Sequence, residues 1–253
     1  MGRVIAVANQ KGGVGKTTTV INLSAYLADS GKRVLAIDID PQGNTTTGLG
    51  VDKQLVDVSM YDVLVGRQPV MDGLVTTDVV GLHLLPATLD LAGAEIEMMH
   101  RDQREMVLKK SIESIRDRYD FVFVDCPPSL GLLTLNALSA ANAVMIPMQC
   151  EFFALEGLSQ LLSTIELVQR RLNPTLALEG VVLTMFDGRT NLATQVAQEV
   201  RQHFTDKVYQ SVIPRTVRLS EAPSHGKPIL RYDPRSRGAQ GYRLLAEEVV
   251  SRG

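Results

Sequence analysis

The residues best suited to do chemistry lie in one glycine-rich stretch, NQKGGVGKTTTV, at residues 9–20. It contains the Gly-Lys-Thr triplet of a phosphate-binding loop, whose backbone N–H groups surround phosphate oxygens. In such a loop the lysine, here Lys16, contacts the β- and γ-phosphates, and the threonine hydroxyl, here Thr17, binds Mg²⁺. The stretch departs from the GxxxxGK[ST] pattern, because Gln10 stands where the first glycine would fall and a second lysine, Lys11, follows. The sequence therefore predicts a nucleotide-binding loop with one lysine more than the pattern requires.

Aspartates follow two other apolar runs, in the motifs DIDPQGN (38–44) and FVFVDCPPS (121–129). Asp38 and Asp40 lie two residues apart on a strand end, so their side chains point the same way. We expect Asp40 to orient an attacking water and Asp38 to lie near the metal, although a strand-end turn with solvated acids has the same spacing. Asp125 ends four apolar residues, as the carboxylate that supports Mg²⁺ does in nucleotide-binding folds of this kind.

These motifs must be positioned by the alternating strands and helices that the hydrophobic pattern indicates. Several apolar runs are nearly continuous, which is typical of parallel strands covered on both faces. The pattern predicts an α/β fold: a single domain over residues 1–253, with a doubly wound, mostly parallel sheet flanked by helices and its ligands at the carboxyl ends of the strands. We expect strands at 3–8, 33–38, 82–87, 121–125, 143–148, 180–185 and 208–213. We expect helices at 17–29 (with Gly31 as its C-cap), 101–118, 132–141, 155–171 and 191–204.

Composition limits the classes of function. The formal net charge is only −2, but residues 1–100 carry a net −4 and residues 189–243 a net +6, so an anion-binding face is expected in the C-terminal part. The two cysteines, Cys126 and Cys150, lack metal or disulfide spacing and are expected to be buried, reduced thiols. No apolar run reaches the roughly 20 residues that span a bilayer. These features are typical of a cytoplasmic protein.

The motifs KGGVGKTT, DIDPQGN, DCPPSLGLLTLNAL, EFFALEGLSQLL and IPRTVRLSEAPSHGKPI together resemble the ParA/Soj chromosome- and plasmid-partitioning ATPases. The resemblance extends along essentially the whole chain and is strongest to the small chromosomal Soj type. It implies a P-loop ATPase with the deviant form of the loop. Larger plasmid relatives carry an N-terminal helix-turn-helix region, which is not expected here because the first predicted strand begins at Arg3.

The resemblance also implies roles for individual residues. Lys11 would reach across a dimer interface to the phosphates of the nucleotide in the other subunit, and Lys11, Lys16 and Asp40 would be the catalytic residues. ATP would be held by Lys11, Gly12, Gly13, Val14, Gly15, Lys16, Thr17 and Thr18. Mg²⁺ would bind Thr17 and, directly or through water, Asp40 and Asp125. The adenine pocket would include Met185, Pro214 and Thr216; many relatives have Asn in place of Thr216, which leaves a side-chain contact to the base open there.

For a Soj-like protein the implied partners are a second copy of the chain with ATP, nonspecific double-stranded DNA, and a ParB-like centromere-binding protein that stimulates hydrolysis. The implied location is the cytoplasm, in association with the nucleoid. DNA binding is expected first from Arg189 and Arg218, and then from Lys227, Arg235 and Arg237. Arginines in surface ion pairs are the alternative for the last three.

Three other classes share parts of this pattern. A MinD-like division-site ATPase has the same loop, but it ends in a basic amphipathic membrane helix, whereas YRLLAEEVVSRG (242–253) carries acids, so no membrane partner is expected. An iron–sulfur ATPase similar to the nitrogenase iron protein needs two cysteines facing a shared cluster, and Cys126 sits inside the phosphate-sensing loop instead. A P-loop ligase or kinase needs an acceptor pocket, which no motif indicates.

Overall fold

The computed structural model describes residues 2–151 and 154–252 of the chain. In this part of the chain, the strands form one sheet in the order β3-β4-β2-β5-β1-β6-β7. The strands are β1 (Arg3–Val7), β2 (Val34–Asp38), β3 (Val75–Thr76), β4 (Leu82–Leu85), β5 (Phe121–Asp125), β6 (Ala143–Gln149) and β7 (Ala177–Thr184). Neighbouring strands run parallel except for the short β3, which is antiparallel to β4. The predicted single α/β domain with a mostly parallel sheet is confirmed.

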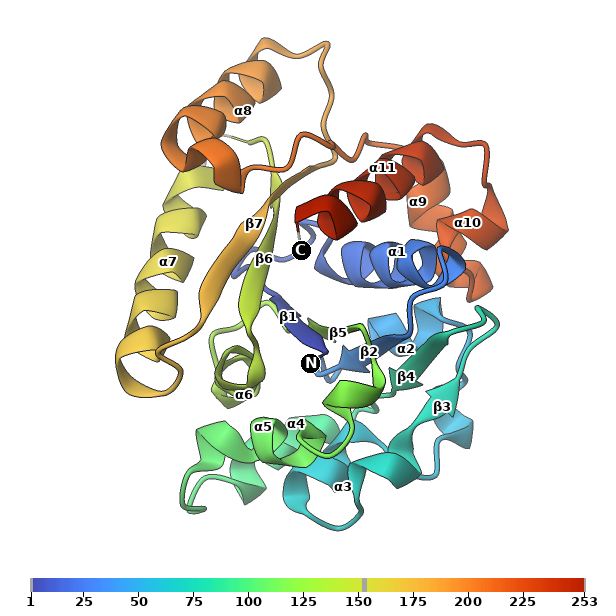
Figure 1. Ribbon diagram of the computed structural model, residues 1–253, viewed down its shortest axis with the longest axis vertical. Helices are drawn as coiled ribbons and strands as arrows, with labels where there is room; N and C mark the ends of the chain where they lie inside the picture. Colours follow the sequence, from blue (N-terminus) through green and yellow to red (C-terminus); the bar gives the residue numbers. More distant parts are fainter. Residues whose placement is uncertain (1, 152–153, 253) are drawn as a thin grey trace.

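Helices cover both faces of the sheet (Figure 1). They are α1 (Lys16–Asp29), α2 (Asn44–Gly48), α3 (Met60–Val65), α4 (Leu91–Glu97), α5 (Val107–Ile112), α6 (Leu132–Ala140), α7 (Ala154–Arg171), α8 (Asn191–Phe204), α9 (Val217–Glu221), α10 (Ile229–Tyr232) and α11 (Arg237–Arg252). α1 packs with α9, α10 and α11 on one face, and α3 to α8 pack on the other. The chain leaves β1 in the direction of β2 but later crosses to β6 on the other side of β1, so a crevice opens at the carboxyl end of β1.

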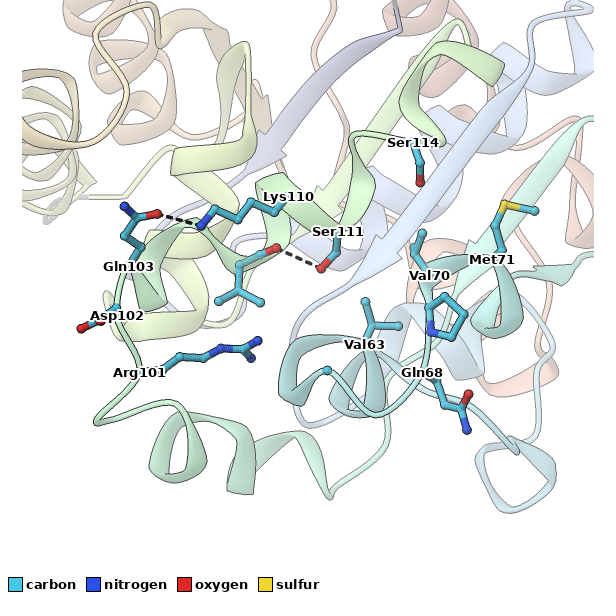
Figure 2. A pocket seen from close by; sticks show the side chains of 13 residues that line it. Val63, Gln68, Val70, Met71, Arg101, Asp102, Gln103, Lys110, Ser111 and Ser114 are labelled. Carbon is cyan, nitrogen blue, oxygen red and sulfur yellow. Dashed lines mark hydrogen bonds between the residues drawn. The ribbon is translucent and has the colours of Figure 1, made fainter.

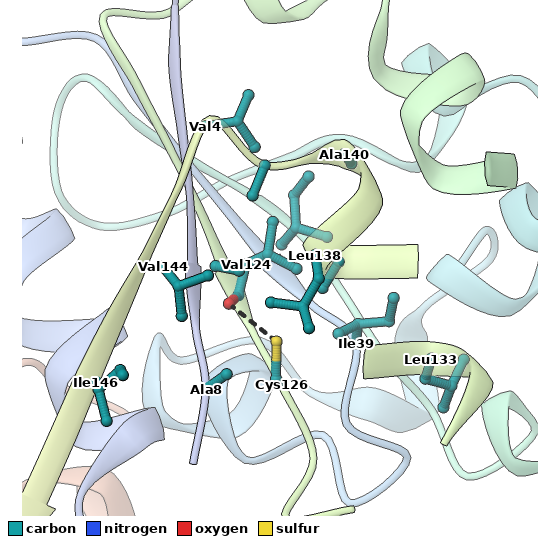
Figure 3. Packing of buried hydrophobic residues seen from close by; sticks show 14 of the residues in the cluster. Val4, Ala8, Ile39, Val124, Cys126, Leu133, Leu138, Ala140, Val144 and Ile146 are labelled. Carbon is teal, nitrogen blue, oxygen red and sulfur yellow. Dashed lines mark hydrogen bonds between the residues drawn. The ribbon is translucent and has the colours of Figure 1, made fainter. Parts of the chain in front are cut away.

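Each central strand contributes side chains to two separate cores. In β1, Val4 and Ala6 belong to the core under α3 to α8, whereas Ile5 and Val7 belong to the core under α1 and α11. This is the two-residue alternation of a strand with both faces buried. Figure 3 shows part of the first core, in which Val4, Val124 and Leu138 belong to one buried cluster that extends to Ala8 and Cys126, the residues directly after β1 and β5. The loops that carry the aspartates therefore stand on a closely packed base.

The prediction of a strand at 208–213 is wrong. This segment runs beside β7 but forms only an isolated bridge between Val208 and Val181, and Ile213 donates its N–H to the Leu183 carbonyl. The reason is that the N–H groups of Gln210 and Ser211 donate to the carboxylate of Glu248 on α11 and not to a strand. A side chain about 40 residues further along the chain has replaced the sheet partner.

The prediction of one continuous helix at 101–118 is also wrong. It is divided into a 3-10 turn at Arg104–Met106, the short helix α5, and a second 3-10 turn at Arg116–Arg118. Gln103 precedes the first turn in the left-handed region at φ 52°, which interrupts the helical pattern. The start of α5 is then fixed from outside, because the Asn136 side chain on α6 accepts the N–H of Leu108 and donates to the carbonyl of Arg104.

The other expected helices agree with α1, α6, α7 and α8 within one residue at each end. Gly31, expected as the C-cap of the first helix, lies one residue beyond the cap residue Ser30. At φ 88° it adopts the left-handed conformation that glycine tolerates, while its N–H donates to Ala28 and that of Lys32 to Leu27. This is the Schellman pattern of helix termination.

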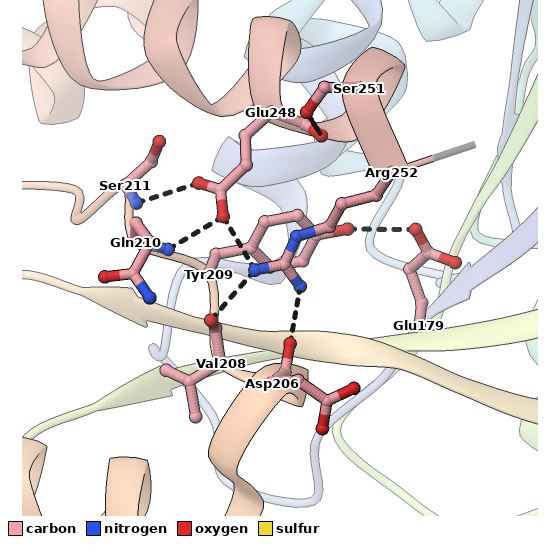
Figure 4. A network of polar contacts seen from close by, with 9 residues as sticks. All are labelled: Glu179, Asp206, Val208, Tyr209, Gln210, Ser211, Glu248, Ser251 and Arg252. Carbon is pink, nitrogen blue, oxygen red and sulfur yellow. Dashed lines mark hydrogen bonds and ion pairs between the residues drawn. The ribbon is translucent and has the colours of Figure 1, made fainter.

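A network of charged and aromatic side chains attaches the end of α11 to the segment after α8 (Figure 4). Arg252 donates to the carbonyls of Asp206 and Val208 and to Glu248, and its guanidinium lies 4.1 Å from the centre of the Tyr209 ring. Tyr209 is fully buried and donates its hydroxyl to Glu179 on β7. The network therefore joins α11, the segment 206–211 and β7.

Replacing Arg252 with methionine should lower the free energy of unfolding by about 1–3 kcal/mol, because charge-assisted hydrogen bonds and a cation–π contact are lost together. The matched control is Arg170→Met, which breaks an exposed ion pair with Glu166 on α7 and should cost no more than about 0.5 kcal/mol. Urea unfolding followed by circular dichroism measures both. Equal losses in the two variants would contradict the role assigned to the network.

Candidate nucleotide-binding site

The loop between β1 and α1 has the backbone of a phosphate cradle. Gly13 and Gly15 have φ values of 73° and 87°, a region that side chains strongly disfavour. A Cβ at Gly13 would meet no atom within 4 Å, so the glycine is required by backbone conformation and not by crowding. The helix begins at once, since Thr19 donates its N–H to the Gly15 carbonyl at 2.9 Å. The free N–H groups and the dipole of the α1 N-terminus therefore meet at the loop, an arrangement that binds anions.

Neighbouring strands hold this loop in place. Asn9 is buried and donates from its side-chain amide to the Pro147 carbonyl on β6, at 2.8 Å. Thr184 ends β7 and donates its hydroxyl to the Val14 carbonyl, at 2.7 Å. Neither contact was predicted from the sequence. The only available signal for Thr184 is a polar residue near the end of the apolar run 180–185.

The two lysines of the loop occupy different surroundings. Lys16 is only 6% exposed, and its Nζ donates to the Lys11 carbonyl at 3.2 Å. Burial lowers the pKa of Lys16, and the negative charge of Asp125 opposes this effect. Lys11 lies at the rim, where its ammonium group forms an ion pair with Glu151, the residue that follows Cys150 beyond β6. One lysine therefore faces into the loop and the other faces a neighbouring segment.

Asp38 and Asp125 lie side by side at the carboxyl ends of β2 and β5, where they are register partners, and both are fully buried. Asp38 accepts hydrogen bonds from the N–H and hydroxyl of Thr46 and from the N–H of Asp40. Asp125 accepts one from the Thr45 hydroxyl at 2.7 Å, but its Oδ1 has no hydrogen-bond partner among the described residues. Burial raises the pKa of Asp38 to about 6, and burial together with the neighbouring Asp38 carboxylate raises the pKa of Asp125 to about 7.

The orphaned Asp125 Oδ1 fits a cation or a cation-bound water. The Thr17 hydroxyl faces the same carboxylate and partly offsets the rise in its pKa. In the described part of the chain, no three His, Cys, Asp or Glu side chains converge on one point as a complete metal site. This donor set suits Mg²⁺, which takes one or two protein oxygens and completes its shell with phosphate and water. When bound there, Mg²⁺ would neutralise phosphate charge, with Thr17 and Asp125 as its protein partners.

Asp40 lies just beyond β2 and is 8% exposed. One of its carboxylate oxygens accepts the N–H of Gln42 at 2.9 Å, and its own N–H donates to Asp38. The bond from Gln42 fixes the direction of the side chain without using both of its oxygens. Asp40 thus has the fixed orientation that a water-positioning group needs.

The three residues expected at the adenine are brought together. Phe186 forms a bridge with Pro214, which places Met185 beside the segment 213–216. Met185 has φ 49°, a strained conformation for a residue with a side chain and one that is concentrated at functional sites. The Thr216 hydroxyl caps α9 by accepting the N–H of Leu219 at 3.3 Å. Because the hydroxyl has this structural use, a base contact from Thr216 is better supplied by its backbone.

The five cations expected to bind DNA are all exposed and lie in the loops and helices from 189 to 237. Arg189 and Arg237 line one surface hollow together with Arg215. The Arg189 guanidinium forms two hydrogen bonds to Asp187, at 2.8 and 2.6 Å, and lowers the pKa of that carboxyl to about 2. Arg218 pairs with Glu221 and Asp233. Part of the hydrogen-bonding capacity and charge of these two arginines is therefore already used by acids of the same subunit.

Several residues of the site were missed by the sequence analysis. Thr45 and Thr46 bind the buried aspartates, and a Thr-Thr-Thr run directly after DIDPQGN was the available signal. Glu95 on α4 accepts the N–H of Leu133 at 3.2 Å and so caps α6, the helix that follows the Asp125 loop. Nothing in the local sequence indicates this contact or the pairing of Glu151 with Lys11, since both join segments far apart along the chain.

A further hollow lies between α3 and α5 and contains none of the predicted site residues (Figure 2). Its polar side chains bond within the wall: Lys110 to Gln103, Ser111 to the Val107 carbonyl, and Arg101 to the Leu64 carbonyl. Across the described residues, no helix has both the length and the apolar character needed to cross a bilayer.

Cys126 and Cys150 are buried free thiols, as expected.

Comparison with known proteins identifies close relatives. A sequence profile described as "AAA domain" matches residues 2–178. The chain is 60% identical to the sporulation initiation inhibitor protein Soj of Bacillus subtilis over 253 residues, covering 100% of both chains. It is 57% identical over 252 residues to the chromosome partitioning protein ParA of Caulobacter vibrioides, covering 99% of this chain and 94% of that one.

Solved structures agree with these matches. The crystal structure of a Mycobacterium smegmatis protein named cobyrinic acid a,c-diamide synthase, with bound ADP and magnesium, has a TM-score of 0.87 and 43% identity and covers 100% of this chain and 95% of that one. The cell division ATPase MinD of Pyrococcus furiosus has a TM-score of 0.84 at 30% identity, with both chains covered completely. The identity to Soj is twice the identity to MinD.

The buried aspartates make a pH-dependent contribution to stability. Their pKa values are raised on folding, so the folded protein binds protons more tightly, and the free energy of unfolding falls as the pH rises from about 4 to about 7. In buffer with EDTA, Asp125→Asn should therefore be more stable than the parent at pH 8, by roughly 1 kcal/mol or more, and the difference should shrink at pH 5.

Chemical unfolding at the two pH values measures the effect, with the exposed Asp72→Asn as control. Added Mg²⁺ with ATP should stabilise the parent and the control but not Asp125→Asn. The assignment fails if Asp125→Asn is destabilised at pH 8, or if Mg²⁺ and ATP still stabilise it fully.

Proposed function

The chain belongs to the Soj/ParA family of chromosome-partitioning ATPases, and we propose that it is an ATP-dependent switch that dimerises, binds DNA nonspecifically and moves a chromosome or plasmid together with a ParB-like partner. The observation that carries the proposal is the contrast between the two loop lysines. Lys16 is buried within its own loop, whereas Lys11 is at the rim and directed elsewhere. A loop of this kind serves two triphosphates, one in its own subunit and one across an interface.

ATP and Mg²⁺ are the proposed cofactors. Phosphate oxygens would accept from the N–H groups of residues 12–18, with Lys16 on the β- and γ-phosphates. The Mycobacterium structure supports this nucleotide, since ADP and magnesium are bound in it. Met185, Pro214 and the backbone at Thr216 would enclose the adenine.

Hydrolysis requires a water aligned with the γ-phosphate and protected from bulk solvent. We assign its alignment to Asp40, because this carboxylate is nearly buried and is oriented by its bond from Gln42. Thr17 and Asp125 would hold Mg²⁺, and Lys11 of the second subunit would offset the charge that develops on the phosphates. An active site completed only by dimerisation makes hydrolysis slow in the isolated subunit and open to stimulation by DNA and the ParB-like partner.

Dimerisation also explains how ATP would control DNA binding. Arg189, Arg218, Lys227, Arg235 and Arg237 give each subunit a basic surface, and pairing two subunits doubles the number of phosphate contacts. Because affinity rises steeply with that number, an ATP-bound dimer would hold DNA while an ADP-bound monomer would release it. The active form would then lie on the nucleoid in the cytoplasm. The test is sizing and DNA binding with ATP, with ADP and without nucleotide, with Lys16→Ala as the variant that should not respond to ATP.

Asp40→Ala should retain ATP binding and ATP-dependent dimerisation but lose hydrolysis, because Asp40 acts on the water and not on the bound nucleotide. The dimer should therefore remain on DNA after ATP is added. Phosphate release and DNA dissociation measure this, with the exposed Asp72→Ala as control. Hydrolysis at the parental rate in the presence of partner and DNA would exclude the assignment.

Arg189→Gln and Arg218→Gln should weaken binding to every DNA sequence alike and flatten the salt dependence, since each lost phosphate contact changes the slope of log affinity against log salt by about 0.9. Asp187→Asn should have the opposite effect on affinity, because it frees Arg189 and removes a nearby negative charge. Dimerisation with ATP should be unchanged in all three variants.

A salt series of DNA binding, run beside a sizing experiment, separates the possibilities, with Arg170→Gln on α7 as the control. Loss of dimerisation in the arginine variants would place these residues in the subunit interface. Unchanged DNA binding would mean that the DNA-binding surface is formed by other cations, namely Arg215, Lys227, Arg235 and Arg237.

A further inference from the structure

Three groups of its own subunit hold Lys11. Its backbone N–H donates to the Asn9 side chain at 3.0 Å, and its carbonyl accepts from the Lys16 Nζ at 3.2 Å. Its ammonium pairs with the Glu151 carboxylate. Asn9 is itself bonded to β6, and Glu151 follows β6, so this one strand and the loop after it restrain both ends of the residue.

These three contacts differ in how they respond to ATP. The bond from Lys16 would be exchanged when its Nζ turns to phosphate oxygens, which frees the Lys11 carbonyl. The bond from Asn9 involves only the backbone and does not oppose movement of the side chain. The pair with Glu151 remains as the contact that keeps the ammonium in its own subunit.

The pair with Glu151 is weak enough to yield. The Lys11 and Glu151 side chains are 39% and 46% exposed, and ion pairs at this exposure change an equilibrium by no more than about fivefold. A triphosphate carries several negative charges, whereas Glu151 carries one. Once the triphosphate of the other subunit comes close, it would therefore bind the Lys11 ammonium more strongly than Glu151 does. Lys11 has a single ammonium group and cannot serve Glu151 and a phosphate in the other subunit fully at the same time.

We infer that Glu151 is a positioning residue that holds Lys11 back in its own subunit and thereby raises the ATP and protein concentrations needed for dimerisation. This rests on the proposed function, in which Lys11 acts across the interface. Forming a symmetric dimer breaks one Lys11–Glu151 pair in each subunit. The factor by which one pair weakens dimerisation is therefore squared in the dimer dissociation constant. Glu151 thus tunes the threshold of the switch through its charge on Lys11.

The test compares Glu151→Gln with the parent in sedimentation experiments over a range of protein concentrations, with saturating non-hydrolysable ATP analogue. Glu151→Gln keeps the size of the side chain and removes the charge, and it should lower the dimer dissociation constant by roughly two- to 25-fold, because two weak pairs no longer oppose assembly. Nucleotide affinity at protein concentrations too low for dimers should not change. Glu166→Gln, which releases Arg170 on the exposed face of α7, is the matched control and should leave the dimer constant unchanged.

Lys11→Ala separates this inference from the proposed function. If Lys11→Ala dimerises like the parent, the role of Lys11 across the interface fails, and the inference fails with it. If Lys11→Ala does not dimerise and Glu151→Gln dimerises equally well or less well than the parent, only the restraining role of Glu151 fails. The inference holds if Glu151→Gln tightens the dimer and the gain disappears when Lys11→Ala is added.

Discussion

Two carboxylates, Asp38 and Asp125, lie fully buried on adjacent strands at the centre of the sheet, and much of the surrounding structure exists to hold them there. Burying like charges side by side is costly unless hydrogen bonds or a cation compensate. Thr46 supplies two donors to Asp38, whereas Asp125 receives one from Thr45 and keeps one oxygen without a partner among the described residues. A cation with its phosphate and water ligands would supply the partner that this Asp125 oxygen lacks. The protein thus stores an unfavourable interaction at the position where the nucleotide is proposed to bind.

The parts of the fold that the sequence predicted well are those determined by local pattern. The apolar runs of β1, β5 and β6 specify buried parallel strands, because both faces of each strand are covered. The phosphate loop and Asp125 were found because their chemistry requires particular residues at fixed offsets from those strands. Thr17 and Asp125 were both expected at the metal, and the structure places the Thr17 hydroxyl beside the Asp125 carboxylate.

The failures arise where distant segments decide the structure. The segment 208–213 has the composition of a strand, yet the N–H groups of Gln210 and Ser211 donate to Glu248. The helix expected at 101–118 is cut short where Asn136 caps it. Glu95 binds the start of α6 and Glu151 binds Lys11, and each partner lies far away along the chain, so no local pattern could reveal these contacts. The pairing of Arg189 with Asp187 spans only two residues, but its geometry depends on the turn that the structure adopts there.

The irregular segment after α8 has a consequence for solubility. β7 is the last strand of the sheet, and a bare outer strand offers unpaired backbone groups to any other extended chain. Here Tyr209 and Ile213 donate to the Val181 and Leu183 carbonyls, and the network around Arg252 keeps the segment against the strand. On the opposite side the sheet ends in β3, which has only two residues. Both margins are therefore poor templates for edge-to-edge aggregation, which matters for a protein proposed to dimerise through its nucleotide face.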